Sequence, residues 1–373
     1  MNATATAIRM FDYVEQYEAL QEEVLDAVRG VLSSGTLILG PRVRQFEEEF
    51  AAWLGGGHGV GVGNGTDALA IALRALGIGQ GDEVITVANT AVPTVSAIRM
   101  AGALPVFADV DPRSLLMNLD DAELRITPRT RAIVPVHLFG NAVDMPAVMR
   151  LAKRHALVVI EDCAQSTGTT CHGQATGTFG DVGCFSFYPT KNLGAYGDAG
   201  FCFTRNAELA EAMRRIRTYG CAGSYDCQRE GVNSRLDELQ AAILSVKLRY
   251  LDDHLAARRG VAQTYAGCLD PAIVRPQVAA AVDCSCHLFV VRVAHRAALV
   301  ERLRQEEIGF GIHYPTPIHL MRGYEFLNHQ AGSLPFTEQA ASEVISLPCY
   351  PELTHESVRR VCRAVNDVAN ITS

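Results

Sequence analysis

The feature that most constrains the fold is an alternation between short apolar runs of strand length and helical stretches. The expected helices cover 67–76, 94–101 and 146–155, and the expected strands cover 83–87, 105–107, 132–136 and 157–160. Apolar strands that alternate with helices indicate an α/β fold with a mainly parallel sheet, covered on both faces. Because ligands bind at the carboxyl ends of such strands, the residues that follow each strand are the first candidates for a functional site.

The length of the chain predicts two domains. A chain of 373 residues exceeds one ordinary core, so we expect a large domain over 1–250 and a smaller C-terminal α/β domain over 251–373. The large domain should begin with a helical segment, because apolar residues recur at helical spacing over 17–32 and a second helix follows Pro41. A long helix over 233–259 should connect the domains. The smaller domain should contain a strand over 287–293 and helices over 296–306 and 355–370.

Composition excludes several classes of function. Lysine and arginine total 33 against 41 aspartate and glutamate, a formal charge of −8, so nucleic acid and an anionic membrane are poor general partners. No run approaches the roughly 20 apolar residues of a membrane helix, and the first ten residues lack a secretory leader, so we expect a cytoplasmic protein. Among the 11 cysteines, Cys284 and Cys286 beside His287 would suit a metal ion; reduced, mostly buried cysteine is the simpler interpretation, and we expect no metal.

An acidic pair, Glu161-Asp162, directly follows the apolar strand expected over 157–160. A carboxylate at the end of a buried strand is costly unless a cation or a hydrogen-bond donor is its partner. Taken by itself, the pair could equally cap a helix or bind a metal. The sequence therefore indicates a carboxylate in need of a partner, and the next feature supplies one.

A lysine stands on a tight turn after another expected strand. The stretch Cys184–Tyr188 alternates with aromatic residues and ends at Pro189, and a glycine-rich loop over 194–200 follows Lys191. Most lysines are solvated surface charges, but apolar and glycine neighbours would desolvate this one, and a neutral amine can form a Schiff base. Chemistry with pyridoxal 5′-phosphate (PLP) needs such a lysine and an acid paired with the protonated pyridine nitrogen. Lys191 and Asp162 fit those two roles.

A glycine turn precedes the first helix of the alternating region and could bind the cofactor phosphate. The turn is Gly63-Asn64-Gly65-Thr66-Asp67. Free N–H groups at a helix N-terminus bind phosphate, and the hydroxyl of Thr66 can add a bond. An ordinary glycine turn with a Thr or Asp cap would look the same. The spacing matches neither the dinucleotide fingerprint nor a Walker loop.

Eight segments extend this pattern, in order, along nearly the whole chain. They are GNGTDAL (63–69), GDEVI (81–85), PVHLFG (135–140), VIEDCAQ (159–165), FSFYPTKNLGAYGDAG (185–200), NSRLDELQAAIL (233–244), HYPTPIHL (313–320) and SLPCYPEL (346–353). Together they resemble the DegT/DnrJ/EryC1/StrS family of sugar aminotransferases. The resemblance implies the aspartate-aminotransferase fold (PLP fold type I) and a homodimer with shared active sites. It also implies transfer of an amino group from L-glutamate to a keto sugar, usually nucleotide-linked, with pyridoxamine 5′-phosphate as the intermediate cofactor form.

The resemblance also implies roles for single residues. Lys191 would hold the cofactor covalently and move the proton of the reaction, and Asp162 would pair with the pyridine nitrogen. The other cofactor contacts would be Gly65, Thr66 and Ser186 at the phosphate with Asp67 beside them, Gln165 near the ring oxygen, and Asn233 from the other subunit. Substrate contacts would be Arg235, His313 and Tyr314.

Three of these residues also have plain structural interpretations. Ser186 could be an ordinary strand serine, and Asn233 could cap the helix that follows it. Arg235 could merely pair with Asp237 or Glu238. One departure from the family concerns Ala91, which stands where many relatives place an aromatic residue that stacks on the cofactor ring. That departure puts the stacking contact in doubt but not the chemistry.

The resemblance further indicates the reaction and the substrate. Some family members are dehydratases with histidine in place of the catalytic lysine, so Lys191 favours transamination. The stretch HYPxPxHL (313–320) and Gln165 resemble members that aminate C3 of a nucleotide-linked sugar, and we expect a dTDP- or UDP-linked 3-keto (deoxy)sugar in deoxyaminosugar biosynthesis. A C4 or cyclitol aminotransferase is the nearest alternative. More remote alternatives are a nucleotide-binding oxidoreductase, which lacks its fingerprint here, and a non-catalytic regulator on the same fold.

Overall fold

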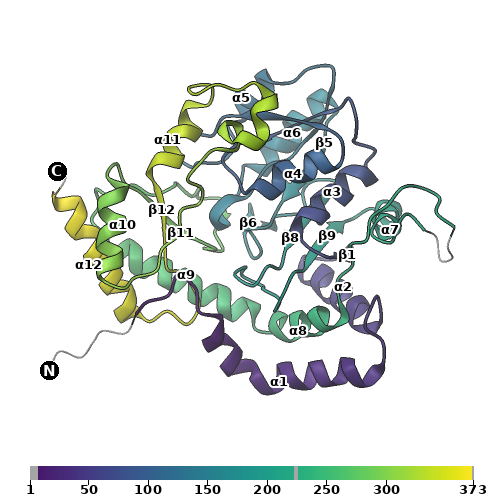
Figure 1. Ribbon diagram of the computed structural model, residues 1–373, viewed down its shortest axis with the longest axis horizontal. Coiled ribbons are helices and arrows are strands. Elements are labelled where there is room, and N and C mark those ends of the chain that lie inside the picture. Colours follow the sequence, from purple (N-terminus) through teal and green to yellow (C-terminus); the bar gives the residue numbers. More distant parts are fainter. Residues whose placement is uncertain (1–6, 222–225, 372–373) are drawn as a thin grey trace.

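The computed structural model describes residues 7–221 and 226–371 and is built around a seven-stranded sheet (Figure 1). The strand order is β1-β9-β8-β5-β4-β2-β3. The strands are β1 (His58–Val62), β2 (Glu83–Val87), β3 (Leu104–Ala108), β4 (Thr130–Ile133), β5 (Val158–Asp162), β8 (Val182–Ser186) and β9 (Gly200–Thr204). Only β9 runs against its neighbours, and the other six strands are parallel. The predicted mainly parallel α/β sheet is confirmed.

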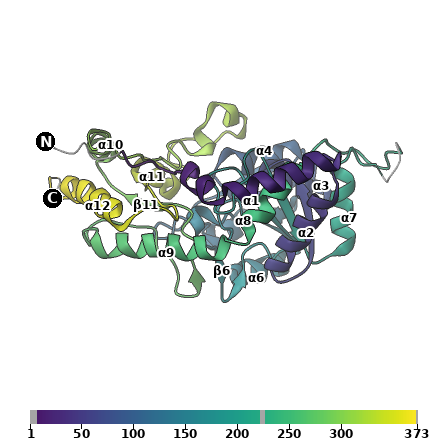
Figure 2. The same cartoon turned by 90° about the horizontal axis from the view of Figure 1, so that it is seen from below.

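Helices cover both faces of this sheet because successive strand residues point to opposite sides. On one face, α3 (Gly65–Ala75), α4 (Val92–Met100) and α7 (Ala207–Ile216) pack on side chains such as Cys184 and Cys202. The opposite face meets two groups of elements. They are α5 (Leu119–Leu124) with α6 (Met145–His155), and α2 (Pro41–Trp53) with α8 (Glu238–Leu248). The first helix, α1 (Tyr13–Ser34), lies outside α8 (Figure 2).

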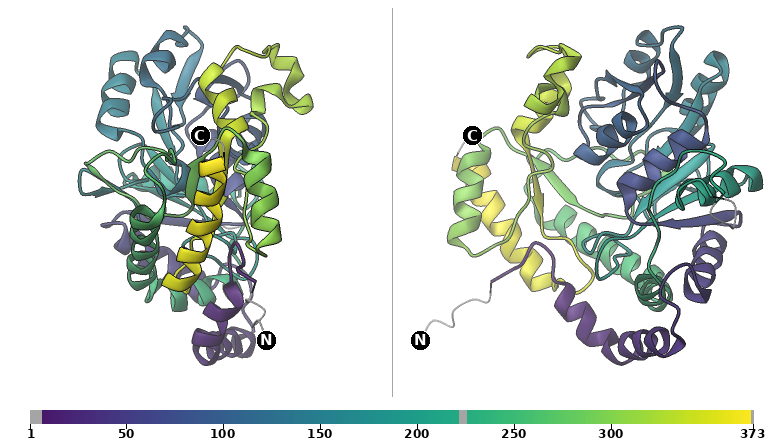
Figure 3. Two further views of the ribbon diagram at one scale, coloured as in Figure 1. Left: turned by 90° about the vertical axis from the view of Figure 1, so that its left-hand side faces the viewer. Right: turned by 45° about the vertical axis from the view of Figure 1, so that its right-hand side comes forward.

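The C-terminal part has its own core. The antiparallel pair β11 (Phe289–Arg292) and β12 (Val344–Leu347) packs with α9 (Leu251–Cys268), α10 (Arg296–Gln305) and α12 (His355–Ile371), which Figure 3 shows apart from the large sheet. The remaining elements are β6 (Thr170–Cys171), β7 (Gln174–Ala175), β10 (Val282–Asp283), α11 (Pro335–Glu343) and the short helices η1 (Leu138–Gly140), η2 (Ile318–Leu320) and η3 (Arg322–Leu327). Ile8 pairs with Ile308, so the N-terminal segment joins this part. The domain boundary at residue 250 stays a prediction; it falls between α8 and α9.

The prediction of one long helix over 233–259 is wrong. The structure has two helices, α8 and α9, with Arg249 and Tyr250 between them. Both of these side chains bond to Glu23 of α1, which holds the chain at the break. The apolar periodicity runs on through the break, so the pattern could not reveal it.

Two strands of the sheet were missing from the prediction. Both β1 and β9 carry glycine, which weakens a strand pattern. The glycine at position 200 has a spatial reason: a Cβ there would lie 2.2 Å from the carbonyl oxygen of Asn64. Gly200 therefore lets β9 lie directly against the turn that begins α3, and this turn is the one predicted to bind phosphate.

Helices long and apolar enough to cross a membrane are absent from the described residues. The prediction that the first ten residues carry no leader falls partly on residues 1–6, which lie outside the described residues.

Candidate active site

Asp162 is the last residue of β5, at the carboxyl edge of the sheet, and it is buried. Thr94 donates to its Oδ2 at 2.7 Å, and the backbone N–H of Ala164 donates to its Oδ1 at 3.1 Å. Thr90 and Thr94 share a hydrogen bond of 2.8 Å, which fixes the donor in turn. Burial raises the pKa of Asp162, while these hydrogen bonds and the charge of Lys191 oppose the rise. The carboxylate is thus oriented, desolvated and in need of a cation.

Lys191 stands on the turn after β8, next to β5 in the sheet. Its backbone N–H donates to Tyr188 at 2.8 Å, which closes the turn, and Asp162 lies opposite Cys184 of β8. The side chain is only partly exposed. Burial lowers the pKa of Lys191 to about 8, although the negative charge of Asp162 acts in the opposite direction. The lowered pKa increases the neutral fraction of this amine near physiological pH, and the neutral form is the one that acts as a nucleophile.

The N-terminus of α3 forms a small cradle beside β8. Asn64 caps the helix by accepting from Asp67 N–H at 2.8 Å, whereas the N–H groups of Gly65 and Thr66 donate to no described residue. A Cβ at position 65 would lie 2.8 Å from Cβ of Ser186, so only glycine fits against that strand. The two free N–H groups and the hydroxyls of Thr66 and Ser186 suit a phosphate.

The predicted cofactor contact Asp67 is engaged within the turn itself. Its carboxylate accepts from Asn64 Nδ2 at 3.0 Å and from Ser234 Oγ at 2.7 Å. Ser234 Oγ also accepts from Gly63 N–H at 2.9 Å. Asp67 therefore stabilises the cradle's shape in this structure, and Ser234, which the sequence did not single out, links the cradle to the segment before α8.

Gln165 connects the sheet edge to the C-terminal part. Its Oε1 accepts from Phe139 N–H at 2.9 Å and its Nε2 donates to the hydroxyl of Tyr314 at 3.0 Å. Burial raises the pKa of Tyr314 to about 12, so the hydroxyl stays protonated. Burial and the charge of Lys191 lower the pKa of His313 to about 4, and this ring bonds to Ser346 at 2.8 Å. Both residues are neutral polar groups at neutral pH.

A cavity of about 310 Å³ brings several predicted residues together. Its lining comprises Met10, Phe11, Gln165, Tyr188, Thr190, Lys191, Arg258, His287, Leu288, His313, Tyr314 and Cys349. Four of these, Gln165, Lys191, His313 and Tyr314, were predicted from the sequence. His287 and Arg258 were not predicted as site residues. Burial lowers the pKa of His287 well below its usual value, and its Nδ1 lies 3.3 Å from Asn192 Oδ1.

Seven predicted residues are not part of this cavity lining, namely Asp162, the residues of the cradle (Gly65, Thr66, Asp67 and Ser186), Asn233 and Arg235. Asn233 is exposed and pairs with Thr218 through the backbone, so within one chain its side chain is free to face a second molecule. Arg235 forms no ion pair with Asp237 or Glu238 among the described residues; Glu238 instead accepts from the N–H groups at the start of α2. The plain interpretation of Arg235 as the partner of those acids is therefore wrong. Ala91 precedes α4 and contributes no ring.

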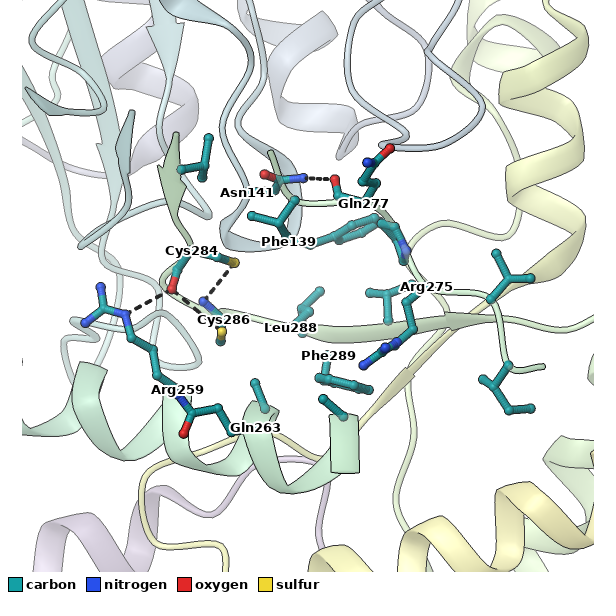
Figure 4. Close-up of a pocket in the computed structure, with 18 of the residues that line it drawn as sticks. Phe139, Asn141, Arg259, Gln263, Arg275, Gln277, Cys284, Cys286, Leu288 and Phe289 are labelled. Atoms are coloured by element: carbon teal, nitrogen blue, oxygen red, sulfur yellow. Dashed lines mark hydrogen bonds between the residues drawn. The ribbon is translucent and has the colours of Figure 1, made fainter. Parts of the chain in front are cut away.

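A second, larger cavity of about 730 Å³ shares Leu288 with the first and contains none of the predicted site residues (Figure 4). Arg259, Arg275 and Phe289 line it. Arg259 bonds to the carbonyl oxygens of Cys284 and Gly168 and pairs with Asp283 at 2.9 Å. Neither Lys191 nor Asp162 lines this larger cavity, so it is not the candidate active site.

The described residues contain one group with metal-ligand spacing, namely His137, Glu161 and Cys163. It does not include Cys284, Cys286 or His287. Glu161 accepts from three backbone N–H groups, each at 2.8 Å, and bonds to His137 at 3.1 Å. His137 Nδ1 accepts from Val143 N–H at 3.2 Å. The carboxylate and the imidazole are therefore satisfied by protein groups, and the pair fixes the strand ends beside Asp162.

The chain belongs to the DegT/DnrJ/EryC1/StrS aminotransferase family, whose model matches residues 18–366. One relative is the dTDP-3-amino-3,4,6-trideoxy-alpha-D-glucose transaminase of Micromonospora megalomicea subsp. nigra, 47% identical over 96% of this chain and 98% of its own length. Another is the UDP-N-acetyl-3-dehydro-alpha-D-glucosamine 3-aminotransferase of Acidithiobacillus ferrooxidans, 43% identical over 96% of this chain and 97% of its own length.

Solved structures show the same fold. DesV of S. venezuelae, solved in complex with a ketimine intermediate, has a TM-score of 0.96 and 42% identity, over 98% of this chain and 99% of that chain. NtdA from Bacillus subtilis, solved with bound cofactor PMP, has a TM-score of 0.90 and 30% identity, over 99% of this chain and 87% of that chain. The predicted family and fold class are both confirmed.

Proposed function

We propose that this protein is a PLP-dependent aminotransferase that moves an amino group from L-glutamate to C3 of a dTDP- or UDP-linked 3-keto sugar, in deoxyaminosugar biosynthesis. The observation that carries this proposal is the pairing of a buried, oriented Asp162 with a lysine whose pKa is lowered to about 8, at the same edge of the sheet. The related NtdA structure with PMP supports the cofactor.

The residues at this edge fit PLP group by group. The free N–H groups of Gly65 and Thr66, with the hydroxyl of Ser186, would hold the phosphate. Asp162 would pair with the pyridine nitrogen, and Lys191 would bind the cofactor covalently through Nζ. Gln165 would lie near the ring oxygen.

The chain's own groups then account for the proton movements. When bound, PLP supplies a protonated ring that withdraws electrons from the carbon undergoing proton loss. Asp162 Oδ2, oriented by Thr94, keeps the ring nitrogen protonated. Lys191 Nζ takes the proton from the substrate carbon and returns it on the cofactor side. The pKa of about 8 suits Nζ to both steps, because acid–base catalysis works best near the operating pH.

C3 is the favoured position of amination because two relatives that act on sugars with different nucleotides are both named for an amino group at position 3 of the sugar. Arg235, His313 and Tyr314 are proposed as sugar-nucleotide contacts. A C4 or cyclitol aminotransferase is the alternative on the same fold. The presence of both Lys191 and Asp162 speaks against a non-catalytic regulator.

The deciding experiment separates the two half-reactions. The enzyme is first aminated with L-glutamate, excess donor is removed, and keto sugars are added one at a time while the cofactor absorbance is followed. Recovery with a dTDP- or UDP-linked 3-keto sugar, but not with the 4-keto isomer, is expected. Recovery only with the 4-keto sugar would overturn the C3 assignment while keeping the cofactor chemistry.

The pKa of Lys191 predicts how cofactor uptake depends on pH. A lysine with a lowered pKa is protonated below about pH 8 and neutral above it, and only the neutral amine attacks a carbonyl. Uptake of PLP by cofactor-free protein should therefore accelerate as the pH rises from 6 to about 8 and then level off. Stopped-flow absorbance after addition of PLP measures the rate. A rate that is flat across this range would contradict the lowered pKa.

The proposed homodimer predicts a dependence on concentration. Exposed Asn233 is proposed to complete the phosphate site of the second subunit, so a separated monomer would hold PLP weakly. Dilution toward the monomer should release cofactor, and Asn233→Ala should release it at higher protein concentration than the wild type. Sedimentation with absorbance detection measures the dimer fraction and the amount of bound cofactor in the same experiment. Tight retention of cofactor by a proven monomer would argue against the shared site.

We further propose a cytoplasmic location. All eleven cysteines are free thiols in the structure, as is typical of a reducing compartment.

A further inference from the structure

Arg258 lies on α9, and its side chain lines the same cavity as Lys191. Only 2% of the residue is exposed. Its Nη1 donates to the carbonyl oxygen of Cys349, but its Nε is buried without a hydrogen-bond partner among the described residues. A fully buried guanidinium with one neutral acceptor is an incomplete arrangement, since buried polar groups in proteins are almost always satisfied.

Another arginine of this chain shows how a purely structural case is built. Arg217 is also buried and its Nε likewise lacks a hydrogen-bond partner among the described residues, but it pairs with Glu47 at 2.6 Å and donates to the carbonyl oxygen of Gly61 at 2.7 Å. Arg258 has no such ion pair among the described residues. Glu352 acts on it electrostatically without forming an ion pair, and burial raises the pKa of Glu352 itself. Lys247 also acts on Arg258 electrostatically, but as a basic group it cannot neutralise the guanidinium. A buried charge left in this state is costly, so the cavity is prepared for an anion.

The rest of the cavity lining agrees with an anionic ligand. No carboxylate occurs among the lining residues that the structure describes. His287 and His313 are held neutral by burial, and the hydroxyl of Tyr314 stays protonated while it accepts from Gln165. The cavity thus places the cationic side chain of Arg258 among neutral polar groups, with Lys191 in the same lining.

We propose that Arg258 binds the α-carboxylate of the amino donor. The proposal rests on the proposed function, in which Lys191 acts on the α-carbon of an amino acid. That carboxylate is bonded directly to the reacting carbon, so it enters the cavity that Lys191 lines. A sugar diphosphate is attached at C1, and ring atoms separate it from a reacting C3. The planar guanidinium matches a carboxylate with two parallel N–H donors.

The test measures the two half-reactions apart, in holoenzyme, for the wild type and three variants. Arg258→Gln removes the charge, and Arg258→Lys keeps the charge but not the two-pronged geometry. Arg259→Gln is the matched control, because Arg259 is adjacent on the same helix, makes more protein contacts and faces the larger cavity (Figure 4). Calorimetry with glutarate, a dicarboxylate without an amino group, reports binding without any reaction.

For Arg258→Gln, amination by L-glutamate should slow by at least about thirtyfold, and glutarate binding should weaken by a similar factor. The amination rate and the glutarate affinity of Arg258→Lys should lie between those of Arg258→Gln and the wild type. The half-reaction with the keto sugar should change by less than about threefold, and Arg259→Gln should leave both half-reactions near the wild type. Circular dichroism checks that each variant is folded.

Three results would overturn the proposal: equal losses in both half-reactions, a loss confined to the sugar half-reaction, or no loss. The first would make Arg258 structural, and the second would assign it to the diphosphate. A wild type that no amino acid aminates would defeat the proposed function instead. Arg258 would then be judged by glutarate binding, where an unchanged affinity in Arg258→Gln refutes its role.

Discussion

Replacement of Lys191 by alanine should lower turnover by about 10⁴-fold, the upper range for loss of a general acid–base group. The loss is expected to be this large because one atom, Nζ, is proposed both to hold the cofactor and to move the proton. The lysine stands on a turn closed by its own N–H bond to Tyr188, and no other lysine lines the cavity among the described residues. Single-turnover absorbance changes with L-glutamate measure the effect.

The informative companion variant is Lys191→Arg. It keeps a positive charge near Asp162, but a guanidinium stays protonated and cannot act as the nucleophile. This variant should therefore fold and remain as inactive as Lys191→Ala. Borohydride reduction followed by mass spectrometry should attach cofactor to the wild type and to neither variant. A residual rate within tenfold of the wild type in either variant would remove Lys191 from the proposed mechanism.

Asp162→Asn should lower turnover by about 10²- to 10³-fold, because an amide cannot stabilise a protonated ring nitrogen as a carboxylate does. The Asp162→Asn substitution should also lower the pKa of Lys191. The negative charge of Asp162 favours the protonated amine, so its removal should move the pKa of Lys191 below about 8. In cofactor-free protein, the pH profile of PLP uptake should then move to lower pH.

A matched control for this substitution is Asp109→Asn. Asp109 is also buried and follows a strand of the same sheet, but its carboxylate accepts from Thr337 and from the N–H of Phe336 at the start of α11. Asp109→Asn should lower the stability of the protein but leave the pH profile of PLP uptake unchanged. A shift of equal size in both variants would show that the profile reports general loosening instead of the charge at position 162.

The sequence predicted the parts of the site whose chemistry requires unusual residues at strand ends. Asp162 and Lys191 were found in this way, as was the glycine turn at 63–67. Arg258 was not found, because an arginine followed by Arg259 on an amphipathic helix is typical of a solvated surface. Which of these two neighbours enters the cavity is decided by how α9 packs against the segment that contains Cys349, and only the fold shows this.

The secondary-structure prediction failed at three places where the spacing of apolar residues does not reveal the local structure. The glycines of β1 and β9 concealed two strands, and the break between α8 and α9 was concealed by continuous apolar spacing. In each case the deciding contact is remote in sequence. Arg249 and Tyr250 are held by Glu23, more than two hundred positions earlier. Such pairings decide where a helix ends, and a local pattern cannot contain them.

The close approach of Gly200 to the carbonyl oxygen of Asn64 fixes the distance between two parts of the site, so the site should select ligands by their length. β9 closes the loop that carries Lys191, and its first residue rests on the turn that carries Gly65. The proposed covalent anchor and the proposed phosphate cradle are therefore spaced by main-chain atoms in direct contact, and substitutions that keep Gly65 and Gly200 should leave that spacing unchanged. Mutations around the ring can tune its electronics and its affinity, while the span from aldehyde to phosphate stays a fixed dimension of the fold.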